Sequence, residues 1–306
     1  MTEAPSLLTC SLCPHHCRLA PGQTGFCRAR SQREGRIRPD NYGFLTSLAL
    51  DPIEKKPLRR FHPGSRILSL GSWGCNLRCP FCQNASISQA GAETAQLQLN
   101  PEQLLALALE YRDKAGSIGV AFTYNEPLVG YEYVRDCARL LKENGLCTVL
   151  VTNGTLCREP WEALLPLVDA ANIDLKGFTP AFYQWLQGDL ETVKTNIQLA
   201  VEAGCHVEVT TLVIPGKNDG AEDMEKEAQW LASLSPDLPL HISRYFPRWH
   251  LELSPTPVAT VYHLAALARK WLKYVYEGNC SKRGCCMRNS PFLRSRVSSR
   301  ESRAVG

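Results

Sequence analysis

Residues 71–84 read Gly71-Ser72-Trp73-Gly74-Cys75-Asn76-Leu77-Arg78-Cys79-Pro80-Phe81-Cys82-Gln83-Asn84. The three cysteines have the spacing Cys-x3-Cys-x2-Cys, and no fourth cysteine lies nearby. An iron–sulfur cube takes one thiolate for each iron, so four cysteines close its coordination. Three thiolates leave one iron open to another ligand. The stretch therefore predicts a [4Fe-4S] cluster on Cys75, Cys79 and Cys82 with one free coordination position.

A structural zinc site is the alternative interpretation of these cysteines. Structural zinc usually takes four Cys or His ligands, commonly as two well-spaced pairs. The next cysteine along the chain is Cys137, and no histidine lies between Trp73 and Asp136. A zinc site here would need a distant ligand, so the spacing favours the iron–sulfur cluster.

The composition places this chain among cytoplasmic globular proteins. Its 306 residues are 44% hydrophobic, which is enough for one large core. No apolar run approaches the roughly 18 residues of a membrane-spanning helix. The acidic start, Met1-Thr2-Glu3-Ala4-Pro5, is no secretory signal. In a reducing compartment, the 14 cysteines indicate metal ligands or catalysis rather than disulfides.

The positive charge comes from the end of the chain. Residues 281–306 carry seven Lys and Arg against Glu301, so the net charge of +4 leaves residues 1–280 at −2. We expect residues 281–306 to form a basic, solvated and disordered tail. Nucleic-acid binding is not expected from such a tail.

Apolar β-rich runs alternate with helical patterns from about residue 66. The order predicts βα units and a parallel sheet. Six such units are too few for a closed eight-stranded barrel, so we expect a partial (β/α)6 barrel in residues 61–280. A small cysteine-rich, metal-binding segment should precede it in residues 1–60. The predicted strands are 66–70, 118–123, 147–152, 171–175, 206–213, 240–244 and a short 274–276. One predicted helix begins at Pro101 and runs through Tyr111, and a second runs through Val134, Ala138 and Leu141 and ends at Gly145. Three more predicted helices span about 189–203, 220–234 and 256–270.

Polar motifs follow the predicted strands, where parallel βα folds place their chemistry. The second strand is followed by Thr123-Tyr124-Asn125-Glu126-Pro127, and the third ends in Thr152-Asn153-Gly154. The fourth ends in Asp174-Leu175-Lys176, the fifth leads into residues 213–219, and the sixth contains His241. Their positions agree with the predicted strands.

The cysteine motif, with an aromatic residue before the third cysteine, resembles the signature of the radical SAM superfamily. The run at 123–127 resembles the variant in pyruvate formate-lyase-activating-type enzymes. The resemblance covers residues 66–277 and implies S-adenosylmethionine (SAM) as cofactor. It also implies SAM contacts from Glu126, Asn153, Asp174, Lys176 and His241, with Glu126 on the ammonium group and Lys176 on the carboxylate.

Each of these residues also has an ordinary structural interpretation. Glu126 would cap the following helix, and Asn153-Gly154 would form a turn. Asp174 and Lys176 would form an internal ion pair, since buried charges need partners. His241 would be a core histidine with its hydrogen bonds satisfied.

A second cysteine cluster precedes the barrel. Cys10, Cys13, Cys17 and Cys27 flank the adjacent His15 and His16 in a Cys-x2-Cys-x3-Cys-x9-Cys pattern. Thiolates suit zinc and iron–sulfur clusters alike. A small structural zinc knuckle is the physical default for this site, and a second cluster that relays electrons is the competing interpretation.

The motifs together look like the radical SAM component of the AmmeMemoRadiSam system. That resemblance implies an AMMECR-domain protein and a Memo-like protein as partners. The chain departs from this family's pattern after Asn279, where Cys280, Cys285 and Cys286 stand in a basic Ser/Arg-rich tail.

We therefore predict a radical SAM enzyme that cleaves SAM reductively and abstracts hydrogen from an unidentified substrate. A low-potential donor such as flavodoxin or ferredoxin would supply the electron. The substrate is a glycyl-radical partner protein, another protein or a small molecule. The alternative from another class is a zinc-stabilised scaffold protein without radical chemistry.

Overall fold

The computed structural model describes residues 7–280, and the predicted tail at 281–306 lies outside them. One eight-stranded sheet forms the centre, in the order β14-β13-β12-β11-β10-β9-β7-β6. Strands β7 to β14 of this order run parallel, and β6 joins β7 antiparallel at the edge. The sheet strands are β6 (Ser47–Pro52), β7 (Arg66–Gly71), β9 (Ser117–Phe122), β10 (Cys147–Thr152), β11 (Ala170–Asp174), β12 (His206–Val213), β13 (Leu240–Arg244) and β14 (Val275–Gly278).

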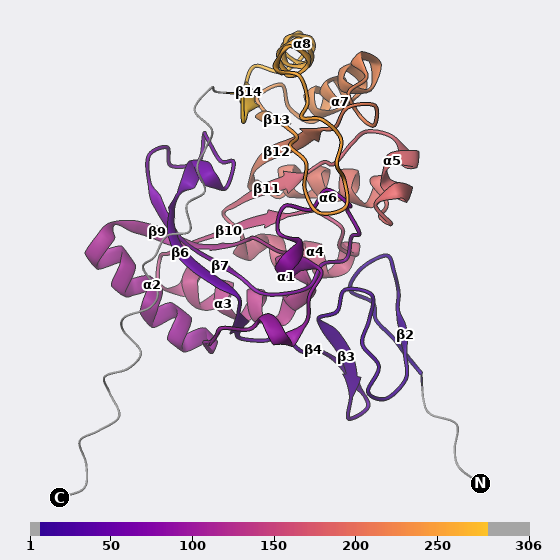
Figure 1. The fold of residues 1–306 in the computed structure, drawn as a ribbon. Helices are drawn as coiled ribbons and strands as arrows, with labels where there is room; N and C mark the ends of the chain where they lie inside the picture. Colours follow the sequence, from indigo (N-terminus) through magenta and orange to yellow (C-terminus); the bar gives the residue numbers. More distant parts are fainter. Residues whose placement is uncertain (1–6, 281–306) are drawn as a thin grey trace, which may run out of the picture.

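Helices connect the parallel strands and cover the sheet on its outer side (Figure 1). No helix in residues 7–280 is long and apolar enough to cross a membrane. The alternation confirms the predicted partial (β/α)6 barrel. The helices are α1 (Ala85–Ser88), α2 (Pro101–Ala115), α3 (Tyr131–Glu143), α4 (Arg158–Leu164), α5 (Pro180–Trp185), α6 (Leu190–Glu202), α7 (Ala221–Leu234) and α8 (Val258–Ala268), with 3-10 turns η1 (Ile53–Lys55), η2 (Ala92–Thr94), η3 (Pro127–Gly130) and η4 (Leu165–Leu167).

The start of α2 illustrates how local sequence sets an element. The Asn100 side chain accepts from the Gln103 amide at 2.8 Å, and the Gln103 side chain accepts from the Asn100 amide at 2.9 Å. This capping box, with Pro101 at the first helical position, fixes the start. Gly116, at φ +64°, ends the helix in the left-handed conformation.

Two apolar layers lie on opposite faces of the strands. The large outer core joins the sheet to the helices, with Leu68, Phe122 and Leu150 among its buried members. A smaller inner layer lies on the other face of the strands, where Ile53 and Leu58 from the segment after β6 pack against them. This inner layer consists of Ile53, Leu58, Ile67, Ala121, Val149 and Ala170.

The N-terminal segment carries two short antiparallel strand pairs of its own, β1–β2 and β3–β4, beside the main sheet (Figure 1), and its β5 pairs with β8 from beyond β7. Residues 47–52, within the predicted 1–60 segment, instead pair with β7 along its whole length. The structure therefore places the edge strand of the core before residue 61. The short strands are β1 (Leu8–Thr9), β2 (Arg18–Leu19), β3 (Arg30–Arg33), β4 (Arg36–Pro39), β5 (Phe44–Leu45) and β8 (Leu97–Gln98).

Candidate active site

The three-cysteine loop begins where β7 ends, at the carboxyl edge of the sheet. Cys79 is buried, and Cys75 and Cys82 are half-buried. Apolar side chains surround them: Leu77, Phe81, Phe182, Leu186, Ile214 and Tyr245. The thiols thus lie in an apolar environment at the edge where parallel α/β sheets place their chemistry.

Hydrogen bonds from the loop after β9 fix the backbone that enters the cysteine loop. Asn125 Oδ1 accepts from the Ser72 amide at 3.0 Å, and its Nδ2 donates to the carbonyls of Trp73 and Gly74 at 3.1 Å. Gly74 has a φ of +91°, and a Cβ there would lie 2.5 Å from the carbonyl oxygen of Cys27. Glycine is required at this close approach.

Burial keeps the thiols of Cys75 and Cys79 protonated when no metal is bound. It raises the pKa of Cys75 well above the ordinary value and that of Cys79 to about 12. The Lys176 ammonium opposes part of the rise at Cys79. Metal binding requires thiolates, so loading this site must release protons.

Glu126 lies buried between the loops that follow β9 and β10. Its Oε1 accepts from the Leu128 amide at 3.0 Å and the Thr152 hydroxyl at 2.8 Å, and its Oε2 accepts from the Asn153 amide at 2.7 Å. Burial raises the pKa of Glu126 to about 7, although these hydrogen bonds lower it in part. Glu126 therefore caps η3, and Oε2 keeps one acceptor position for a cation.

Asn153 connects the loop after β10 to the first cysteine. Its Nδ2 donates to Asn76 Oδ1 at 2.8 Å and lies 3.6 Å from Cys75 Sγ. Its Oδ1 accepts from the Thr155 amide at 2.8 Å, which fixes the orientation of the amide group. Polar hydrogens near a ligating sulfur tune the potential of a cluster.

Asp174 ends β11, and Lys176 follows two residues later. Lys176 Nζ lies 2.6 Å from Asp174 Oδ2, and the two side chains are 19% and 29% exposed, respectively. Burial lowers the pKa of Lys176, but Asp174 and the thiols of Cys79 and Cys82 raise it by more. The pair therefore offers a fixed cation beside the cysteine loop, which complements a carboxylate.

The structure places His241 away from this group of residues. Its Nε2 lies 2.6 Å from Glu208 Oε2, and its ring stacks on Tyr276 with centroids 5.2 Å apart. Glu208 Oε1 also lies 3.0 Å from His206 Nε2. His241 thus has the buried protein partner expected of a satisfied core histidine.

Tyr124 and Asn125 shape the site, although the sequence assigned them no role. Tyr124 has a φ of +73°, a left-handed conformation that is rare for a bulky residue. Its hydroxyl donates to Asp51 Oδ2 at 2.7 Å, and Lys56 Nζ donates to the same oxygen at 2.9 Å. The sequence signal for these two residues was their place in the polar run 123–127. The left-handed backbone conformation of Tyr124 leaves no such signal in the sequence.

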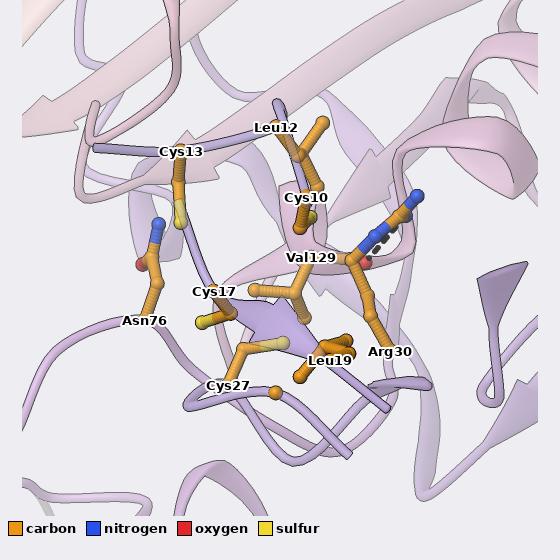
Figure 2. Close-up of a pocket in the computed structure, with 10 residues that line it drawn as sticks. Cys10, Leu12, Cys13, Cys17, Leu19, Cys27, Arg30, Asn76 and Val129 are labelled. Carbon is orange, nitrogen blue, oxygen red and sulfur yellow. Dashed lines mark hydrogen bonds between the residues drawn. The ribbon is translucent and has the colours of Figure 1, made fainter. Parts of the chain in front are cut away.

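The four N-terminal cysteines line a separate cavity (Figure 2).

No group of three or more His, Cys, Asp or Glu side chains within residues 7–280 is arranged to hold a metal ion. A cube does not need such convergence, because each iron takes its own thiolate. The thiol donors of Cys75, Cys79 and Cys82 therefore fit an iron–sulfur cluster.

Comparisons with known proteins agree with this geometry. A family model described as the radical SAM superfamily matches residues 72–231. An uncharacterised protein of Methanocaldococcus jannaschii is 39% identical over 274 residues, which cover 88% of this chain and 80% of that protein. A pyruvate formate-lyase-activating enzyme of Clostridium pasteurianum is 28% identical over 166 residues, which cover 53% of this chain and 67% of the enzyme.

A solved structure shows the same fold. Streptococcus suis SuiB bound to precursor peptide SuiA has a TM-score of 0.56 at 14% identity, covering 74% of this chain and 51% of SuiB. The predicted enzyme class is confirmed by the family match, which argues against the zinc-stabilised scaffold. The family implies a [4Fe-4S] cluster and SAM as cofactors. This chain belongs to the radical SAM superfamily.

Proposed function

We propose that the chain cleaves SAM reductively at a [4Fe-4S] cluster on Cys75, Cys79 and Cys82 and abstracts hydrogen from a substrate. When bound, the cluster and SAM supply the electron and the 5'-deoxyadenosyl radical, while the protein binds and orients them. The observation that carries this proposal is the Asp174–Lys176 pair beside the cysteine loop.

The polar residues at this edge have distinct proposed roles. Lys176 pairs with the carboxylate of SAM, and Asp174 keeps Lys176 charged and oriented. The free acceptor position on Glu126 Oε2 takes the SAM ammonium group. Asn153 holds the loop of Cys75 in place through Asn76. His241 stays outside the SAM site, because Glu208 occupies its Nε2.

The proposed substrate is a peptide segment of a partner protein. Large exposed apolar side chains, Phe246, Trp249 and Leu253, lie in the loop after β13. This loop is tied to the cysteine loop, because the His250 amide donates to the Pro80 carbonyl at 2.9 Å. An exposed apolar rim beside a site supports docking of a protein partner.

Similar proteins support the same substrate class. One relative is named for activating pyruvate formate-lyase, and SuiB was solved with a precursor peptide. A glycyl-radical partner is the form of this proposal that the relatives favour. The AMMECR-domain and Memo-like partners, and flavodoxin or ferredoxin as the donor, remain predictions from the sequence.

Anaerobic reconstitution tests the proposal. We expect reduced protein with SAM to form 5'-deoxyadenosine, measured by chromatography, and Cys79→Ala to abolish the product. Cys147→Ala, a half-buried cysteine in β10 outside the site, should keep it. Product formation that persists in Cys79→Ala, or is absent from well-reconstituted wild type, would contradict the proposal.

A further inference from the structure

The N-terminal segment forms a closed loop around four cysteines. Strands β1 and β2 pair antiparallel, and the Cys10 amide donates to the Cys17 carbonyl at 2.9 Å. Cys27 comes from the next turn, where the Arg28 amide donates to the Gly25 carbonyl at 3.0 Å. The fold therefore brings together three thiols from the β1–β2 connection and one from the turn that carries Cys27.

The four cysteine side chains line one cavity (Figure 2). Cys10 and Cys27 are buried, and Cys13 and Cys17 are half-buried. The rest of the lining is mostly apolar, from Leu12, Leu19 and Val129. Arg30 also lines it, but its guanidinium is held by Glu132 at 2.6 Å and by the Val129 carbonyl at 3.2 Å. No other charged side chain lines this cavity among the described residues.

We propose that Cys10, Cys13, Cys17 and Cys27 bind a second iron–sulfur cluster, which passes electrons to the cluster of the three-cysteine loop. Four thiolates are the usual ligand set of a closed electron-carrying cluster. The site has no open position, so it suits electron transfer rather than substrate binding.

The arrangement of the thiols favours a cluster over zinc. Tetrahedral zinc with Zn–S bonds of about 2.3 Å brings its sulfurs to within about 3.8 Å of one another. Here the thiols line a cavity instead of converging on one ion. In the three-cysteine loop, whose proposed cofactor is an iron–sulfur cube, the thiols likewise do not converge on one ion. Both sites also direct a backbone amide at a sulfur: Phe26 at Cys17 Sγ and Leu77 at Cys75 Sγ, each at 3.4 Å.

The two cysteine sites share a backbone hydrogen bond. The Cys75 amide donates to the Cys27 carbonyl at 3.2 Å, so a ligand of one site is bonded directly to a ligand of the other. The close approach at Gly74 brings these two backbones together. A short bonded path of this kind suits electron transfer between two clusters.

Side chains reinforce the same junction. Arg78 donates to the carbonyls of Cys75 and Phe26, and its guanidinium lies 3.7 Å from the centroid of the Phe26 ring. His15 stacks on Phe26 with centroids 4.0 Å apart, and its Nε2 lies 2.8 Å from the Asn76 carbonyl. Residues next to the cysteines of one site therefore contact the segment that carries the cysteines of the other site.

The transfer is a one-electron exchange. A reduced low-potential iron–sulfur or flavin protein loses one electron, the N-terminal cluster gains it, and the cluster on the three-cysteine loop then takes it. No bond forms or breaks at the N-terminal site. The relay rests on the proposed SAM cleavage, whereas the presence of the second cluster does not.

The first test isolates the N-terminal site in the full chain. After anaerobic reconstitution, Cys75→Ala/Cys79→Ala/Cys82→Ala should keep about half of the wild-type iron and sulfide. On reduction it should show an electron paramagnetic resonance signal that SAM does not change. Adding Cys13→Ala and Cys17→Ala should remove that iron. Zinc in place of iron, or no metal in the folded triple variant by circular dichroism, would overturn the proposal.

The second test concerns the relay. In Cys13→Ala/Cys17→Ala, 5'-deoxyadenosine formation driven by reduced flavodoxin should fall at least tenfold, and dithionite should restore it. Cys147→Ala should behave as wild type with both reductants. Equal rates with flavodoxin would overturn the relay. If wild type retains two clusters but makes no 5'-deoxyadenosine with either reductant, the function proposed above fails while the second cluster stands.

Discussion

The two ends of the barrel each bury a glutamate, and the surroundings of the two carboxylates differ. Glu126, at the carboxyl end, accepts hydrogen bonds from two amides and one hydroxyl. These donors are neutral, and Asp174 lies nearby. Burial and this like charge therefore raise its pKa to about 7.

Burial also acts to raise the pKa of Glu208, which lies near the start of β12. The hydrogen bonds that Glu208 accepts lower this pKa by more. His206 and His241 contact its two oxygens, and the amides of Arg59 and Arg60 donate to it at 3.0 and 2.7 Å. Together they lower the pKa of Glu208 to about 2. One end of the barrel thus fully satisfies its buried charge, and the other keeps acceptor capacity for a ligand.

Lys176→Met should show the largest effect and act only at the carboxyl end. Losing one partner of a desolvated charge pair costs about 2–5 kcal/mol, so the dissociation constant of SAM should rise by at least about 30-fold. Equilibrium dialysis on the reconstituted protein measures this. Lys114→Met, on the exposed side of α2, is the matched control. Unchanged SAM affinity in Lys176→Met would remove Lys176 from the proposed site.

Glu208→Gln should act on stability rather than on SAM. Hydrogen bonds to a charged group are worth about 1.5–3 kcal/mol, so we expect the free energy of unfolding to fall by about 2 kcal/mol at neutral pH. Urea unfolding of the metal-free protein measures this, and the SAM affinity of the folded holoprotein should not change. A loss of SAM affinity without a loss of stability would contradict the separation of the two ends.

The difference between Glu208→Gln and wild type should also depend on pH. Because the pKa of Glu208 is lowered from 4.5 to about 2, its stabilisation is fully present above pH 4.5. The stabilisation is lost as the pH falls toward 2. The two unfolding free energies should therefore converge in acid, and a constant gap would point to packing instead of charge.

The pH dependence of SAM binding should give the smallest effect. If the ionised form of Glu126 binds the SAM ammonium, affinity is full above its pKa of about 7. It should fall about tenfold between pH 7.5 and 6, since each unit below the pKa costs about 1.4 kcal/mol. Asp174 and the Cys75 thiol, which also lie near the Glu126 carboxyl group, are not altered in this experiment. Glu126→Gln should bind weakly at every pH; wild-type affinity and pH profile in this variant would leave Glu126 only its capping role.

The sequence predicted the parts of this protein that depend on short stretches of chain. The seven parallel strands lie within a few residues of their predicted positions, and α2 begins at the predicted Asn100 cap. Helices α4 and α5 were missed, because both are short. The edge strand β6 was missed because it is defined by its pairing with β7, and that pairing leaves no pattern within residues 47–52 themselves.

Site residues were predictable as candidates but not as partners. Asp174 and Lys176 are two residues apart, so the sequence already suggested their pairing. Glu126 with Thr152 and Asn153, and His241 with Glu208, join different strands, so their pairing depends on sheet order and register. The structure therefore separated His241 from residues that the motif order had grouped with it.

The sequence by itself predicted the chemistry of this protein, because the proposed cluster and its open position rest on three cysteines at a fixed spacing. It also determined the alternation of strands and helices. Only the tertiary structure decided that the Cys27 carbonyl meets the Cys75 amide. That contact requires a glycine at position 74 and the folding of the N-terminal loop onto the barrel, and neither spacing nor periodicity encodes contacts between such distant segments.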